Sequence, residues 1–139
     1  MIRQYSLAKD GNRKLAPSFN TREFRCRDGT DTILVDEALT VVLQCIREHF
    51  GKAVTITSGY RTPEHNAEVG GSKSSQHLLG RAADFYVEGV PVATVAAYAE
   101  TLLPGRGGIG RYPKDAKHPK RMTGWVHIDT RTNKSRWKG

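Results

Sequence analysis

The sequence predicts an α+β domain in which helices pack on a central antiparallel sheet. Apolar residues recur at helical spacing in two long segments, 36–50 and 91–103. Short alternating and β-branched segments indicate strands, and strands and helices come mixed rather than in strict alternation. The length of 139 residues fits one domain. We therefore expect residues 1–139 to form a single domain, with residues 1–32 as an N-terminal extension packed on its core.

The extension leads into the first long helix. Residues 1–32 are polar, and we expect loops there, with Phe24 holding a short helical turn against the core. The helix covers 36–50, where the apolar residues share one face. Asp36 suits its start and Gly51 suits its end.

A strand is expected next, over 53–58, because β-branched residues alternate along it. Thr62 and Pro63 then open a short helix as N-cap and first helical residue. Residues 72–80 are expected to form a loop, and residues 81–87 a second strand.

The second half repeats this mixed order. Pro91 opens the second long helix, which ends near Leu103. Residues 107–112 form a glycine-rich strand or turn, and a basic loop follows over 113–123. The last strand is expected over 124–130.

The net charge of +8 predicts attraction to polyanions, including nucleic acid, anionic lipid and cell-wall polymers. No basic and aromatic strand pattern or recognition-helix pattern supports nucleic-acid binding. No stretch approaches the roughly 18 apolar residues of a membrane span, so membrane insertion is not expected. The N-terminus lacks an apolar signal segment, so we expect the protein to be made in the cytoplasm and to reach an external substrate only when it is released. We also expect a monomer.

The cysteines and three of the histidines receive structural interpretations. Cys26 and Cys45 lack C-x-x-C spacing, so a cysteine zinc site is not predicted; a disulfide stays open, and two reduced thiols are expected. His49 suits the C-terminal end of its helix as a charge partner. His65 is expected at the surface, and His118 lies in the basic loop.

Asp84 is the first sign of a chemical site. It lies between Ala83 and Phe85 in an apolar strand, where a carboxylate needs a partner. Arg61 would provide one, and a metal cation would provide another. Zinc accepts imidazole nitrogen and carboxylate oxygen, and His77 lies seven residues earlier at the edge of the preceding loop.

A third ligand is available in the last strand. Trp125, His127 and Asp129 share one face because side chains alternate along a strand. Two histidines and one carboxylate would leave the fourth zinc position open for water. That arrangement is typical of a catalytic zinc site rather than a structural one.

These residues form a pattern that resembles a known family. Ser75-x-His77-x-x-Gly80-x-Ala82-x-Asp84 is similar to the S-x-H-x-x-G-x-A-x-D motif of zinc D-Ala-D-Ala carboxypeptidases and related peptidoglycan peptidases. Their superfamily includes vancomycin-resistance dipeptidases, phage L-alanyl-D-glutamate endolysins and the hedgehog signalling domain. Residues 19–26, 58–66, 107–110 and 125–129 also resemble family segments, so the likeness covers most of the chain.

The resemblance implies a hedgehog/DD-peptidase-like fold and one zinc ion. It implies that His77, Asp84 and His127 are the ligands. Arg61 would stabilise the charge that develops on the substrate carbonyl or carboxylate. Ser75 would brace the loop or contact substrate, and Gln76 would line the substrate cleft. The implied reaction is hydrolysis of a peptide bond by metal-activated water.

One position departs from the family pattern. Many relatives carry an acidic residue or histidine two or three positions before the last zinc histidine, as general base. Here Gly124 and Trp125 occupy those positions. Asp129 is the nearest acidic substitute, as base or as a group that orients a ligand. His118 or Asp115 could also swing in from the basic loop.

Two functions are therefore expected. The first is a zinc metallopeptidase that cuts a peptidoglycan stem peptide, as carboxypeptidase, endopeptidase or phage-lysin-like endolysin. The second is a catalytically weak module of the same fold that keeps the zinc and binds cell-wall peptide or a protein.

Overall fold

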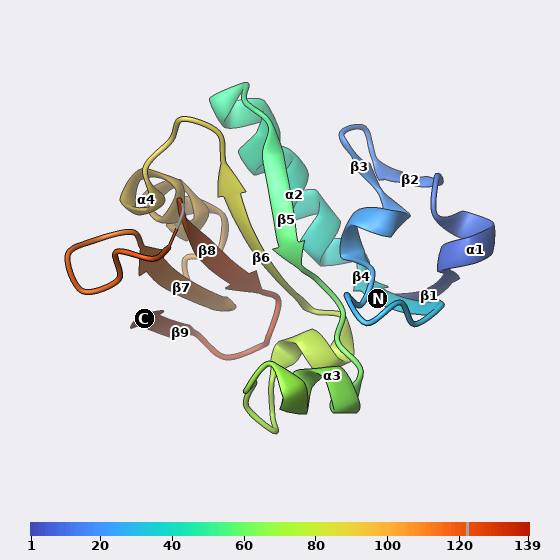
Figure 1. Cartoon of the computed structure of the whole chain (residues 1–139). Helices are drawn as coiled ribbons and strands as arrows, with labels where there is room; N and C mark the ends of the chain where they lie inside the picture. The colour runs from blue at the N-terminus through green and yellow to red at the C-terminus, as the bar shows by residue number, and fades with distance from the viewer. Residues whose placement is uncertain (122) are drawn as a thin grey trace.

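The computed structural model describes residues 1–121 and 123–139 and shows an α+β fold built around one five-stranded sheet (Figure 1). The strand order is β5-β6-β8-β7-β9. Their bounds are β5 (Val54–Ser58), β6 (Ala82–Val87), β7 (Gly108–Pro113), β8 (Gly124–Asp129) and β9 (Ser135–Lys138). The predicted fold class is therefore confirmed.

Two long helices, α2 (Glu37–Phe50) and α4 (Val92–Leu102), pack against one face of this sheet and against each other. In Figure 1 they lie behind the strands. Alternate residues of β6 and β8 point into the core between sheet and helices; Phe85, Val126 and Ile128 are almost fully buried there. Within the described part of the chain, no long helix covers the opposite face of the sheet. The intervening residues of β6 and β8 point toward that face.

The helix ends follow the sequence signals. The Asp36 side chain accepts a hydrogen bond from Ala38 N and caps α2, which ends at Gly51 in the left-handed conformation. Thr62 caps the short helix α3 (Pro63–Glu68), with Pro63 as its first residue. These predictions are confirmed.

Residues 1–32 differ from the expected loops. Figure 1 shows them as a small layer beside β5. The layer contains β1 (Ile2–Ser6), α1 (Leu7–Asp10), β2 (Lys14–Ala16), β3 (Phe19–Asn20) and the 3-10 turn η1 (Thr21–Phe24). β1 pairs antiparallel with β4 (Thr32–Asp36), forming a sheet of only two strands. Because β1 is mostly exposed, its polar sequence shows no strand alternation. Phe24 is buried as expected.

The main sheet also departs from a purely antiparallel arrangement. β9 was not predicted, and it pairs parallel with β7. β8 runs antiparallel to β7. After β8 the chain reverses once and reaches the far side of β7, so β9 necessarily runs in the same direction as β7. The sheet is therefore mixed.

Gly80 positions the connection into β6. A 3-10 turn, η2 (Gln76–Leu79), ends at this glycine, whose φ is +72°. A Cβ at Gly80 would lie 2.4 Å from the carbonyl oxygen of Leu34 in β4. The Gly80 carbonyl accepts a hydrogen bond from Asp36 N at 2.8 Å. Only glycine allows η2 to lie this close to β4.

Across the described residues, no helix has both the length and the apolar character needed to cross a membrane.

Candidate metal centre

The centre is built on one row of residues that crosses the helix-free face of the sheet. Asp84 of β6 is the register partner of Ser58 on one side and of His127 on the other. His127 in turn pairs with Gly110 of β7, and Gly110 with Trp137 of β9. Strand pairing alone therefore brings Asp84 and His127 together, although they are 43 residues apart.

His77 reaches this row from η2. Its backbone N–H donates to Ser75 Oγ at 3.2 Å, which fixes the start of the turn. Its ring Nδ1 lies 2.7 Å from the carbonyl oxygen of Gly59. Because a carbonyl can only accept, Nδ1 carries the proton and Nε2 offers its lone pair. Nε2 lies 3.4 Å from Asp84 Oδ2.

His127 is held between two carboxylates. Its Nδ1 lies 2.9 Å from Asp84 Oδ1, and its Nε2 lies 2.8 Å from Asp129 Oδ2. Burial opposes a charge on this ring, but the hydrogen bonds to Asp129 and Asp84 outweigh burial and raise the pKa of His127. With Nε2 directed to Asp129, Nδ1 is the nitrogen that faces His77 and Asp84.

The three residues fit a metal ion. One ligand atom each from His77, Asp84 and His127 lies within 4.8 Å of the other two. Burial opposes ionisation of Asp84, yet the His127 and His77 rings beside it keep its pKa well below the usual range. The site thus offers an anionic oxygen and two imidazole nitrogens, a donor set that zinc accepts. Three protein ligands leave a coordination position for water or substrate.

Asp129 lies on the side of His127 that faces away from the metal cavity. Its side chain is fully buried. It accepts hydrogen bonds from Gly108 N at 2.9 Å and from Arg131 Nε and Nη2 at 2.8 and 2.6 Å. Burial opposes ionisation, but the contacts from His127 and Arg131 lower the pKa of Asp129. Its acceptor positions are therefore occupied by groups of the protein.

The metal centre opens into a cavity of about 480 Å³. Arg61, Ser75 and Gln76, the other residues expected at the site, all line this cavity; Asp129 is absent from its lining. Arg61 Nη2 lies 3.4 Å from Asp84 Oδ2. The guanidinium of Arg61 is therefore an ion-pair partner of Asp84 and also a cation at the cavity wall. The sequence had suggested both positions, the first as a partner for the Asp84 carboxylate and the second as a group near the substrate.

One family of known proteins matches this chain. A family model described as Peptidase M15 matches residues 17–129, which is most of the chain. The chain belongs to the Peptidase M15 family. The matched range contains all three candidate ligands, and it ends before β9.

Curated relatives of this M15 chain are peptidoglycan endopeptidases. A probable peptidoglycan L,D-endopeptidase MepK from Haemophilus influenzae is 34% identical over 91 residues, covering 62% of this chain and 43% of that protein. The peptidoglycan L,D-endopeptidase MepK of Escherichia coli K12 is 34% identical over 84 residues, covering 57% of this chain and 41% of that protein. The chain thus matches less than half the length of each relative.

The M15 chain completes its cavity with aromatic residues that sequence reasoning did not assign to the site. Trp137 Nε1 donates to Tyr112 Oη at 2.7 Å, and its ring centroid lies 5.0 Å from that of His127. Tyr112 stacks on Trp125 at 4.9 Å. Gly110 makes room for the Trp137 ring, because a Cβ there would lie 2.5 Å from it.

The described residues of the basic loop place no base at the metal cavity. His118 Nδ1 lies 3.0 Å from Asp115 Oδ1, so these two residues pair with each other. Neither lines the metal cavity. Among the described residues that line it, no carboxylate or imidazole is present besides the three candidate ligands.

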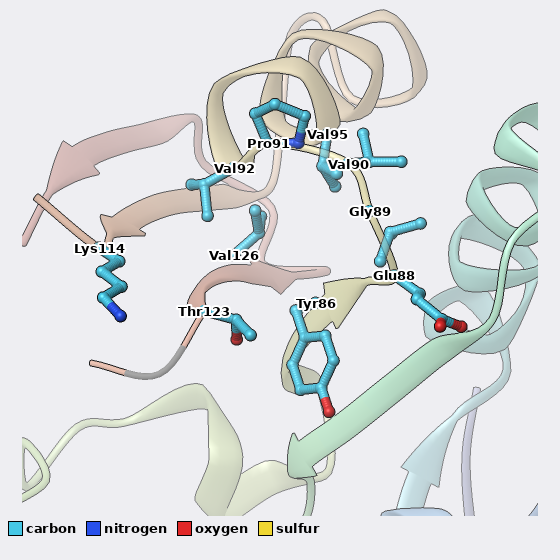
Figure 2. A pocket seen from close by; sticks show the side chains of 11 residues that line it. Tyr86, Glu88, Gly89, Val90, Pro91, Val92, Val95, Lys114, Thr123 and Val126 are labelled. Atoms are coloured by element: carbon cyan, nitrogen blue, oxygen red, sulfur yellow. The ribbon is translucent and has the colours of Figure 1, made fainter. Parts of the chain in front are cut away.

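Another cavity, of about 360 Å³, lies at the opposite end of β6 (Figure 2). Its wall is mainly apolar, with Tyr86 from β6, Val92 and Val95 from α4, and Glu88 as its acidic residue. Figure 2 shows these side chains around a hollow that contains none of the candidate metal ligands. This cavity therefore does not belong to the metal centre.

Proposed function

We propose that this M15 peptidase hydrolyses a peptide bond in peptidoglycan stem peptides, with one zinc ion held by His77, Asp84 and His127. The observation that carries the proposal is the convergence of these three ligand atoms in a cavity that also holds Arg61. When bound, zinc supplies a Lewis acid and a water of lowered pKa. The chain's own residues position the substrate and stabilise charge.

Arg61 and Asp129 have separate roles in this proposal. The guanidinium of Arg61 is held by Ser58 Oγ at 3.0 Å and Asn66 Oδ1 at 3.3 Å. Such a preorganised cation stabilises negative charge on the scissile carbonyl oxygen. Asp129 orients His127 by accepting from its Nε2, since the Asp129 carboxylate is buried and fully occupied.

Gln76 and Ser75 contact the substrate backbone. The Oε1 atom of Gln76 is buried and has no hydrogen-bond partner within the described part of the chain. A buried acceptor without a partner is costly, and a peptide N–H in the cavity would satisfy it. Ser75 lines the same cavity.

We favour internal cleavage over removal of a terminal residue. A neighbouring hollow, of about 390 Å³ and lined by Thr57, Tyr86 and Thr123 among others, shares Asp84 and Trp125 with the metal cavity. A substrate chain can therefore extend past the metal centre. The relatives named as L,D-endopeptidases support the same choice.

Mass spectrometry of muropeptides tests this function. Zinc-loaded protein is expected to release stem-peptide fragments whose new termini identify the bond that was cut. His77→Ala removes a ligand, and we expect it to release none. Cleavage that is unaffected by His77→Ala would contradict the proposal.

One observation favours a second candidate, a module that binds cell-wall peptide without cutting it. The described lining of the cavity offers no carboxylate or imidazole to act as base beyond the candidate ligands. Protein that binds zinc and wall peptide, but cleaves no muropeptide, would establish this second function instead.

A further inference from the structure

We propose that the chain holds a second divalent transition-metal ion between Cys26, Asp28 and His65, called here the Cys26 site. One ligand atom of each residue lies within 4.8 Å of the other two. The site shares no residue with His77, Asp84 and His127. The inference concerns metal binding and does not depend on the proposed function.

The fold builds this site from two segments that are distant in sequence. Cys26 and Asp28 follow η1, and His65 belongs to α3. A backbone hydrogen bond from Tyr60 N to the Phe24 carbonyl, at 3.0 Å, holds the segments together. Cys26 is fully buried, and the side chain of His65 is 16% exposed rather than at the surface as expected. Asp28 is exposed, so solvent can complete the coordination.

Thr62 orients all three residues. Its N–H donates to Cys26 Sγ at 3.5 Å, and its hydroxyl donates to Asp28 Oδ2 at 3.1 Å. The same hydroxyl accepts from His65 N at 3.2 Å. The bonds to the Cys26 thiol and the Asp28 carboxylate are of the kind that fixes ligands in metal sites. The bond to the His65 backbone caps α3, the helix that carries this ligand.

His65 carries an unsatisfied group. Its Nδ1 is buried and lacks a hydrogen-bond partner among the residues that the structure describes. Glu68 Oε2 lies 3.6 Å from this nitrogen, beyond hydrogen-bond distance. Both cysteines are free, so the Cys26 thiol is not committed to a disulfide. Sulfur, imidazole and carboxylate together select zinc and its transition-metal neighbours over magnesium or calcium.

The Cys26 site is connected to the cavity through α3. His65 contributes to the site, and the next residue, Asn66, accepts a hydrogen bond from Arg61 Nη1 at 3.3 Å. A metal ion at the Cys26 site would therefore anchor the helix that helps to position Arg61. This gives the site a structural role rather than a reaction of its own.

Cobalt titration of the metal-free protein tests the proposal. A thiolate bound to Co²⁺ gives a near-ultraviolet charge-transfer band, whereas the His77 centre has no sulfur ligand. We expect the band in the wild type, in His77→Ala and in Cys45→Ser, a matched control with the other thiol. We expect its loss in Cys26→Ser. A wild type without the band, or a band that persists in Cys26→Ser, would overturn the proposal.

Metal analysis and a second variant complete the experiment. The wild type should retain about two ions per chain, one for each cluster, and Cys26→Ser about one. If Cys26→Ser does not fold by circular dichroism, His65→Ala replaces it and should lose the band. Failure of the protein to cut muropeptides leaves these readouts unchanged, so the two proposals fail separately.

Discussion

His127 is the residue whose surroundings say most about the centre. Asp84 faces its Nδ1 and Asp129 faces its Nε2, at 2.9 and 2.8 Å. Arg131 neutralises Asp129 from behind and is itself 30% exposed. The ring is therefore fixed with one nitrogen directed to the metal centre and the other directed to a buried anion. A buried carboxylate in this position sets the tautomer and raises the basicity of a ligand.

Replacement of Asp129 separates the two roles that the sequence left open. If Asp129 orients His127, Asp129→Asn should weaken zinc affinity by roughly 10- to 100-fold. Competition with a chromophoric chelator measures this affinity. Asp115→Asn, which alters a different aspartate–histidine pair, should leave the affinity unchanged. Loss of turnover with unchanged zinc affinity would identify Asp129 as the base instead.

The sequence predicted the residues of the centre better than its surroundings. His77 and Asp84 lie in one short motif, whereas His127 was added from the face of a later alternating strand and from the family resemblance. Trp137 could not be assigned, because its place depends on the pairing of β9 with β7. Cys26 and His65 meet only through tertiary contacts, and no local spacing connects them.

At the scale of elements, the turn from η2 into β6 sets the distance between the two ends of the motif. Gly80 combines a positive φ with a close approach to Leu34. Gly89 has the same φ of +72°, but nothing lies within 4 Å of the position that its Cβ would take. Substitutions at Gly80 and Gly89 should therefore both include the free-energy cost of a left-handed backbone, but only a substitution at Gly80 should add the cost of a clash with Leu34.

Alanine substitutions at these glycines should differ in stability. Gly89→Ala should lower the free energy of unfolding by roughly 1 kcal/mol, the cost of the left-handed conformation. Gly80→Ala should lower it by at least about 1 kcal/mol more, because the added methyl group displaces β4. Chemical denaturation measures both values. Equal losses would show that the contact with Leu34 has no role.

Elements were predictable where the sequence pattern and burial coincide. α2, α3, β5, β6 and β8 follow capping signals or alternation and lie near the predicted ranges. β1 escaped prediction because it is exposed and polar, and β4 because it continues directly into α2. The parallel pairing of β9 is a property of the whole sheet rather than of its four residues.

At the scale of the whole molecule, the net charge of +8 is the main feature beyond the site. Cell-wall polymers rich in phosphate and carboxylate would attract such a surface. We propose that this charge contributes wall affinity. A role in the wall also requires the chain to reach it, which for a phage-lysin-like protein would follow release from the cell.

Salt should therefore weaken the binding of the protein to isolated cell walls. Attractions between exposed charges are screened beyond about 8 Å at physiological ionic strength and at shorter range in higher salt. A pull-down with purified walls, run over a series of salt concentrations, measures the bound fraction. Binding that does not change with salt would show that the net charge plays no part.

The most direct test of the central claim is muropeptide release by protein that has been stripped of metal and then reloaded with zinc. We expect no release before reloading, release after it, and none from His127→Ala under either condition. Release at the wild-type rate from metal-free protein or from His127→Ala would contradict a peptidase centred on His77, Asp84 and His127.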